Sequence, residues 1–120
     1  MGTIHQLALI EEGALLGTNV TIGPFTTIGA NAVIEDNVDI HEHVVIKGNT
    51  LIGEGTEVFP YTTIGLAPQD LSYSGEYSRV IVGKNCKIRE NVTIRAGTAK
   101  GISLTQVGDG CLLMVGAHAA

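Results

Sequence analysis

The chain has 120 residues, of which 44% are hydrophobic but only 4% aromatic, and it contains no Trp. This length corresponds to one domain, and an interior without large rings must be filled by aliphatic and small residues, which favours narrow, repetitive β structure. The formal net charge of −5 argues against nucleic-acid binding. No apolar run is long enough to span a bilayer, and no signal-peptide pattern opens the chain, so we expect a soluble, cytoplasmic protein.

Aliphatic residues recur at every sixth position through the first half of the chain. A period of six is even, so residues at i and i+4 both face one side of a strand, and it does not match the 3.6-residue period of a helix. Four residues after each of the first nine aliphatic positions lies a small or β-branched residue, from Ala14 to Thr62. The aliphatic series comprises Ile10, Leu16, Ile22, Ile28, Ile34, Ile40, Ile46, Ile52, Val58 and Ile64.

Three such hexads joined by corners make a closed triangular coil, and stacked coils bury the aliphatic residues of one another. The frequent Gly residues, sixteen in all, suit tight corners because Gly accepts backbone angles that other residues resist. We therefore predict an all-β fold, a parallel β-helix with the shape of a triangular prism. It forms a single domain over residues 1–120.

The repeat fails twice, at residues 66–79 and at residues 95–106. Between these segments it continues at Val82, Ile88 and Ile94, and after the second it returns at Val107, Leu113 and Ala119. We interpret both interruptions as loop excursions from the prism. Loops on a rigid scaffold commonly carry function, so these segments are the first candidates for a site. Because the last coil is unfinished, we expect a truncated chain whose remaining coils and cap are absent.

Two further features of the repeat region concern thiols and charge. Cys86 and Cys111 fall where the repeat requires a small inward residue, so we predict buried free thiols and neither a disulfide nor a metal site. The first 60 residues hold eight acids and one base, whereas six bases lie close together in the second half. Those bases form either a solvated charged face or a docking surface for an anionic partner. They are Arg79, Lys84, Lys87, Arg89, Arg95 and Lys100.

The residues in and around the interruptions carry a family resemblance. The chain resembles the N-terminal part of the acyl-[acyl carrier protein]–UDP-N-acetylglucosamine O-acyltransferases of lipid A synthesis, which are hexapeptide-repeat acyltransferases. The matching strings are Ile64-Gly65, Pro68-Gln69-Asp70-Leu71, Tyr73-Ser74-Gly75-Glu76, Ile88-Arg89-Glu90, Val92-Thr93-Ile94, Gly97-Thr98, Leu112-Leu113-Met114 and Ala117-His118-Ala119-Ala120.

The resemblance implies transfer of a (3-hydroxy)acyl chain from acyl carrier protein to the 3-hydroxyl of UDP-N-acetylglucosamine, the first step of lipid A synthesis. It implies no cofactor, because the acyl donor is carried on the phosphopantetheine of acyl carrier protein. It also implies a left-handed helix sense and a homotrimer with active sites in clefts between adjacent prisms. Acyl chain length is set in the family by coils beyond this sequence.

A hydroxyl that attacks a thioester requires a general base and donors for the oxyanion, and histidine is the natural base near pH 7. In the family, two histidines three residues apart follow the Leu-Leu-Met run, and the second is the general base. His118 matches the first, and the second would directly follow Ala120. The resemblance therefore gives His118 an auxiliary catalytic and substrate-binding role, and we expect the 120-residue chain to be inactive alone.

The resemblance also assigns the binding residues. Gln69 and Asp70 would hold the sugar, Leu71 and Met114 would line the acyl channel, and Arg79, Lys84, Lys87 and Arg89 would dock acyl carrier protein. Each has a plain structural alternative, since Pro-Gln-Asp makes a good turn, the apolar pair can serve packing, and His118 can be an outward residue of an ordinary coil. Two departures from the family alter local charge: Ser72 stands where Lys is usual, and Arg95-Ala96 replaces His-Arg.

Two other functions remain open. The same prism occurs in gamma-class carbonic anhydrases, which bind zinc through a His-x4-His pair, a spacing absent from this sequence. His5, His41 and His43 lie at non-inward positions and are expected to be exposed, so we predict no metal site, and stoichiometric zinc would favour this alternative. A non-catalytic scaffold would have no need of the Gln69-Asp70-Leu71 segment, and binding of UDP-N-acetylglucosamine would discriminate against it.

Overall fold

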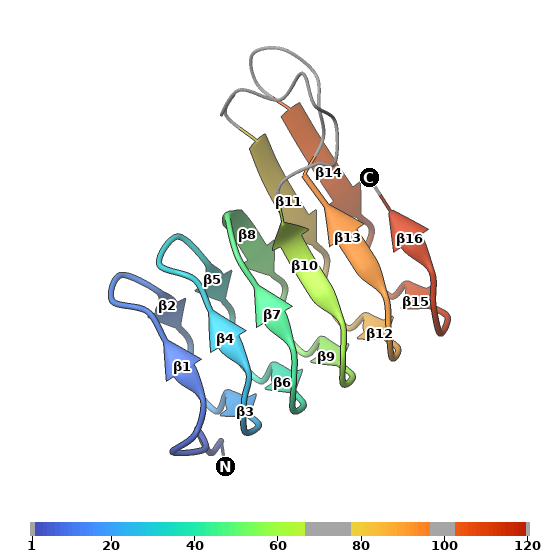
Figure 1. Cartoon of the computed structure of the whole chain (residues 1–120). Coiled ribbons are helices and arrows are strands. Elements are labelled where there is room, and N and C mark those ends of the chain that lie inside the picture. Colours follow the sequence, from blue (N-terminus) through green and yellow to red (C-terminus); the bar gives the residue numbers. More distant parts are fainter. Residues whose placement is uncertain (1, 67–77, 97–102, 120) are drawn as a thin grey trace.

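The computed structural model describes residues 2–66, 78–96 and 103–119. These residues form three sheets of parallel strands and contain no helix that could cross a membrane (Figure 1). Sheet I is β1 (Leu9–Ile10), β4 (Thr27–Ile28), β7 (Val45–Ile46), β10 (Thr63–Leu66), β13 (Thr93–Arg95) and β16 (His118–Ala119). Sheet II is β2 (Leu15–Leu16), β5 (Val33–Ile34), β8 (Asn49–Ile52), β11 (Ser78–Val82) and β14 (Ser103–Val107). Sheet III is β3 (Thr21–Ile22), β6 (Asp39–Ile40), β9 (Glu57–Val58), β12 (Lys87–Ile88) and β15 (Leu112–Leu113).

Consecutive strands lie in different sheets, and each strand pairs with the strand three places later. Leu9 is opposite Thr27 in sheet I, and Leu15 is opposite Val33 in sheet II. Pairings between uninterrupted coils therefore join residues 18 positions apart, which is one complete triangular coil (Figure 1). Across the two interruptions the paired residues are 30 and 25 positions apart, as for Thr63 with Thr93 and Thr93 with His118. The predicted parallel β-helix is confirmed, with three six-residue sides in each uninterrupted coil.

The core is a set of vertical aliphatic ladders inside the prism. In sheet I, Ile28, Ile46 and Ile64 are all 0% exposed and lie opposite one another in successive coils. Ile10 and Leu16 in the first coil, and Leu113 and Ala119 in the last described coil, are only half-buried, because among the described residues each of these coils has a neighbour on one side alone. The side chains one residue earlier in each strand point outward, as the two-residue period of a strand requires.

Buried threonines fill several of the predicted small positions because their hydroxyls link one coil to the next. The Thr62 hydroxyl donates to the carbonyl oxygen of Arg89 at 2.6 Å and accepts from the Val92 amide at 3.2 Å. Thr56 does the same with the carbonyl of Gly83 and the amide of Cys86. A buried hydroxyl without partners would be costly, so threonine suits these corners only because the next coil supplies both partners.

The structure corrects the boundaries of both predicted excursions. Leu66, Ser78 and Arg79 belong to strands, as do Arg95 and residues 103–106. The five-residue β11 pairs with β8 on one side and with β14 on the other, so backbone hydrogen bonds extend these strands beyond the aliphatic position. Val80 and Thr105 supply additional inward side chains there. The remaining parts of the excursions, residues 67–77 and 97–102, lie outside the described residues.

Both cysteines are free thiols, as predicted. Cys86 is buried, and its Sγ lies 3.1 Å from the carbonyl oxygen of Gly108 in the next coil. Cys111 is half-buried at the equivalent place one coil later. Both serve as small inward residues of the prism.

Candidate functional site

His118 and the starting points of both interruptions lie on consecutive strands of sheet I. His118 lies on β16, opposite Thr93 of β13, and its side chain faces the exposed outer surface of the sheet. The segment that contains Gln69, Asp70 and Leu71 follows β10, and the second interruption follows β13. Because β10, β13 and β16 are consecutive strands of one sheet, both interruptions begin next to the surface that carries His118.

The two points where the chain leaves sheet I are tied together. Leu66 is opposite Arg95, after an irregularity in the pairing of β10 with β13, and the amide of Ala96 donates to the carbonyl oxygen of Leu66 at 3.1 Å. Gly65 has φ +84°, and a Cβ built on it would collide with the Lys47 carbonyl oxygen and the Thr50 hydroxyl. Glycine is therefore required here, and it fixes the direction in which the chain approaches residues 67–77. Gln69, Asp70 and Leu71 themselves lie outside the described residues.

Met114 lies at the corner between β15 and β16 and is 64% exposed. It precedes His118 by four residues, at the entrance to sheet I. Such an exposed side chain is suited to contact with an apolar ligand. It is not part of the core formed by the described residues.

The four predicted docking bases are distributed around one coil. Arg79 lies on the outer face of sheet II, Lys84 at the corner between sheets II and III, Lys87 on sheet III and Arg89 at the next corner. Lys87 Nζ lies 2.9 Å from Glu57 Oε1, and Arg89 Nε lies 3.2 Å from Glu90 Oε1. The Arg89 guanidinium carbon also lies 4.1 Å from the centroid of the Phe59 ring. The bases therefore face different directions, and two of them have carboxylate partners within the chain.

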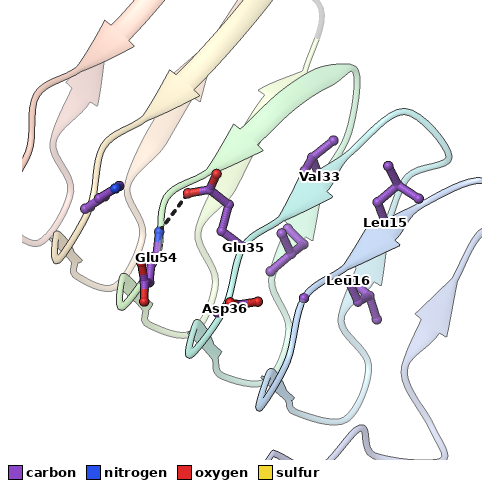
Figure 2. Close-up of a pocket in the computed structure, with 9 residues that line it drawn as sticks. Leu15, Leu16, Val33, Glu35, Asp36 and Glu54 are labelled. Carbon is purple, nitrogen blue, oxygen red and sulfur yellow. Dashed lines mark hydrogen bonds between the residues drawn. The ribbon is translucent and has the colours of Figure 1, made fainter.

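The outer faces of the sheets differ in chemistry. Sheet II presents a stripe of aliphatic side chains: Leu15, Val33, Leu51 and Ile81. A shallow cavity of about 340 Å³ lies against Leu15 and Val33 and is bordered by Glu35, Asp36 and Glu54 (Figure 2). A second cavity, of about 270 Å³, is lined by Leu51 and Arg79 among others. Sheet III instead presents charged groups, namely Asp39, Glu57 and Lys87.

Two columns of rings stand at the corner between sheets III and I, and sequence analysis missed both. His43 stacks between Phe25 and Tyr61, with ring centroids 5.2 and 5.1 Å away, and His41 stacks on Phe59 at 4.7 Å. The prediction that His41 is exposed is wrong, since its side chain is only 30% exposed. The Phe59 ring in the next coil covers it. Comparing residues 18 positions apart would have revealed both columns.

His41 also takes part in a charged group on sheet III. Its Nε2 lies 2.8 Å from Glu57 Oε2, while Lys87 donates to the other oxygen of the same carboxylate. The hydrogen bond from Lys87 lowers the pKa of Glu57 below its usual value, and the His41 imidazole adds to this effect against the opposing influence of partial burial. Glu57 is thus held as a carboxylate between two partners.

Comparison with known proteins bears on the predicted resemblance. A family model described as bacterial transferase hexapeptide (six repeats) matches residues 13–48. The acyl-[acyl-carrier-protein]–UDP-N-acetylglucosamine O-acyltransferase of Rickettsia canadensis is 50% identical over 115 residues, which are 96% of this chain and 44% of that protein. The predicted resemblance is confirmed. A second relative with the same name, from Bartonella quintana, is 45% identical over 117 residues.

Solved structures with the same fold support the match. The UDP-N-acetylglucosamine acyltransferase of Bacteroides fragilis superposes with a TM-score of 0.91 at 48% identity, covering 98% of this chain and 46% of that one. The corresponding protein of Acinetobacter baumannii gives a TM-score of 0.93 at 38% identity, covering 98% and 45%. The fold class is confirmed as a left-handed parallel β-helix. The chain spans less than half the length of these relatives.

Proposed function

We propose that the polypeptide carrying this chain transfers a (3-hydroxy)acyl group from acyl carrier protein to the 3-hydroxyl of UDP-N-acetylglucosamine, the first step of lipid A synthesis. One observation carries the proposal: His118 and the starting points of both interruptions lie on consecutive strands of sheet I. The names of the relatives agree with it. The acyl group arrives on the phosphopantetheine of acyl carrier protein in the cytoplasm, so the reaction requires no further cofactor.

Chain geometry permits the proposed roles. Asp70 follows Leu66 by four residues, a distance of at most about 14 Å along a fully extended chain. Strands β10 and β16 are two steps apart in sheet I, which is about 10 Å at the usual strand spacing. A sugar hydroxyl that donates to the Asp70 carboxylate or bonds to Gln69 therefore lies within reach of the His118 imidazole. Leu71 and the exposed Met114 would contact the acyl chain.

His118 acts in this proposal as an auxiliary group that contacts and orients the substrate, while the general base is the histidine expected after Ala120. Arg79, Lys84, Lys87 and Arg89 attract the acidic surface of acyl carrier protein. Arg79 and Lys84 are exposed, whereas Lys87 and Arg89 have intramolecular carboxylate partners. The first two are therefore the stronger contacts.

An acyl-transfer assay on the full natural polypeptide tests these roles. We expect Asp70→Asn to raise KM for UDP-N-acetylglucosamine about tenfold or more, because a hydrogen bond to a charged acceptor contributes about 1.5–3 kcal/mol. We expect His118→Ala to lower kcat/KM by about tenfold, a loss below that typical of a general base. His5→Ala, which removes an exposed histidine elsewhere on the prism, is the matched control. Unchanged kinetics in both site variants would contradict the assignment, and failure of the unaltered protein to bind UDP-N-acetylglucosamine would favour a non-catalytic scaffold.

We further propose that the protein is a homotrimer. In a closed ring of three subunits, each interface joins one face of a subunit to a different face of its neighbour. Sheet II offers its aliphatic stripe, and sheet I offers Leu9, Val45 and a row of threonines. The charged outer face of sheet III is poorly suited to burial in such an interface. The proposal therefore joins sheet I of one prism to sheet II of the next.

Replacing Leu51 by Glu is expected to convert the trimer to monomers, because a carboxylate would enter the aliphatic stripe without a partner. Thr21→Glu, which places the same charge on the outer face of sheet III, is expected to leave the trimer intact. Molar mass measured by light scattering after size-exclusion chromatography reports the state of both variants, and circular dichroism verifies folding. A Leu51→Glu protein that remains trimeric would exclude sheet II from the interface.

A further inference from the structure

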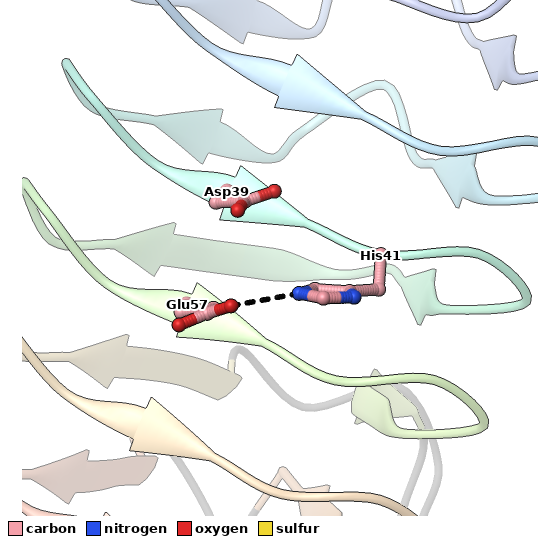
Figure 3. Close-up of side chains that lie close together, drawn as sticks. All are labelled: Asp39, His41 and Glu57. Atoms are coloured by element: carbon pink, nitrogen blue, oxygen red, sulfur yellow. Dashed lines mark hydrogen bonds and ion pairs between the residues drawn. The ribbon is translucent and has the colours of Figure 1, made fainter.

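The outer face of sheet III brings together Asp39, His41 and Glu57 (Figure 3). Asp39 of β6 lies directly opposite Glu57 of β9, and His41 follows Asp39 by two residues, so all three side chains emerge on the same side. One potential ligand atom from each residue lies within 4.8 Å of the other two. The group thus brings the ligand atoms of two carboxylates and one imidazole close together.

The three side chains are held in different ways. Stacking on Phe59, with centroids 4.7 Å apart and planes at 19°, fixes the orientation of the His41 ring. The hydrogen bond of 2.8 Å between His41 Nε2 and Glu57 Oε2 aligns the second ligand with the first. Within the described residues, no hydrogen bond or ion pair engages the Asp39 carboxylate. Two ligands are therefore preorganised, and the third is available.

We propose that Asp39, His41 and Glu57 bind a divalent transition-metal ion, for which Zn²⁺ is the best match. Zinc combines imidazole nitrogen with carboxylate oxygen at about 2.0–2.2 Å, and Co²⁺ and Mn²⁺ accept the same donors. Ligation requires neutral His41 with its proton on Nδ1, so that Nε2 offers a lone pair. The ion then replaces the hydrogen bond between His41 and Glu57, and water completes its coordination on the solvent side.

Lys87 sets the affinity of this site. Its ammonium lies 2.9 Å from Glu57 Oε1 and leaves Oε2 for the metal, so Glu57 is a monodentate ligand. The positive charge of Lys87 also repels the incoming cation. Lys87 therefore keeps the affinity of the site low while it positions one ligand.

The site shares Lys87 with the proposed docking surface for acyl carrier protein, but none of its three ligands has a role in the proposed acyl transfer on sheet I. It contains one imidazole and so differs from the histidine-rich zinc site of a carbonic anhydrase. Zinc that is lost when Asp39 is altered would belong to sheet III and would leave the acyltransferase proposal unaffected.

Calorimetric titration of the untagged 120-residue chain with Zn²⁺ tests the proposal, with Co²⁺ absorption spectroscopy as a second measurement. We expect one ion per chain. Asp39→Asn and His41→Gln should each weaken binding by at least about tenfold, and Lys87→Met should strengthen it by about tenfold. Glu42→Gln, which removes an exposed acid adjacent to His41 but outside the group, should leave affinity unchanged. Circular dichroism verifies that each variant folds.

Two results would overturn the proposal. The first is the absence of saturable binding to both the unaltered chain and Lys87→Met, which would leave a purely structural ion-pair group. The second is binding that Asp39→Asn and His41→Gln do not weaken, which would locate the ion elsewhere. Because Lys87→Met is expected to gain affinity, the test does not depend on a loss that misfolding could imitate.

Discussion

Replacing Gly65 by Ala is expected to lower the free energy of unfolding by about 4 kcal/mol, the sum of backbone strain and a steric conflict. Gly65 adopts φ +84°, which an L-residue rarely adopts, and a Cβ there would meet the Lys47 carbonyl oxygen and the Thr50 hydroxyl. The Lys47 oxygen belongs to the backbone of the adjacent coil and cannot move aside without disturbing the pairing of β7 with β10. Urea denaturation followed by circular dichroism measures the loss.

Gly110→Ala separates the two causes. Gly110 also has a positive φ, +68°, but a Cβ there would meet nothing within 4 Å. Only the backbone strain remains, so we expect a loss of about 1 kcal/mol. Equal losses in the two variants would show that the close approach of Gly65 to the adjacent coil contributes nothing.

Truncation of Ile46 to Ala is the second large effect we expect, a loss of about 3–4 kcal/mol. Ile46 is fully buried and lies between Ile28 and Ile64 in the sheet I ladder. Rigid coils above and below hold these neighbours in place, so the cavity left by the missing atoms cannot collapse readily. Chemical denaturation of the purified chain provides the measurement.

Thr21→Ala is the matched control because Thr21 points outward from sheet III, a face that the proposed trimer leaves free. We expect it to cost no more than about 1 kcal/mol, as substitutions away from the core usually do. A loss as large as that of Ile46→Ala would show that burial in the ladder is not the cause of the larger effect.

Much of the fold was predictable because a six-residue period fixes which side chains face inward. Ile28, Ile34 and Ile40 have their predicted burial, since an even period leaves no other consistent arrangement. The ends of the excursions were not predictable in this way. Strands β11 and β14 extend to Ser78 and Ser103 because they pair with each other, and that pairing joins residues 25 positions apart across an interruption.

The candidate site was predictable only in part. The position of His118 beside the starts of both interruptions follows from the repeat count, and the structure places it there. The roles of Gln69, Asp70 and Leu71 stay predictions, since these residues lie outside the described part of the chain. The group of Asp39, His41 and Glu57 on sheet III was missed because it forms only when side chains 16 positions apart, those of His41 and Glu57, come together. Reading the sequence in columns of 18 would place Asp39 beside Glu57, whereas Lys87 is displaced from that column by the first interruption.

Both interruptions occur at the same corner, on the way from sheet I to sheet II. On an uninterrupted side of the prism, successive inward aliphatic residues are six positions apart. At this corner the spacing is 18 positions from Ile64 to Val82 and 13 positions from Ile94 to Val107. Even so, Val82 is still opposite Ile52, and Val107 is opposite Val82. The entropic cost of closing a loop grows slowly with its length, by only about 0.6 kcal/mol for each doubling. This corner can therefore gain, lose or exchange residues while every inward ladder keeps its partners. In evolution and in protein engineering alike, new segments can be grafted at this edge without redesign of the prism beneath them.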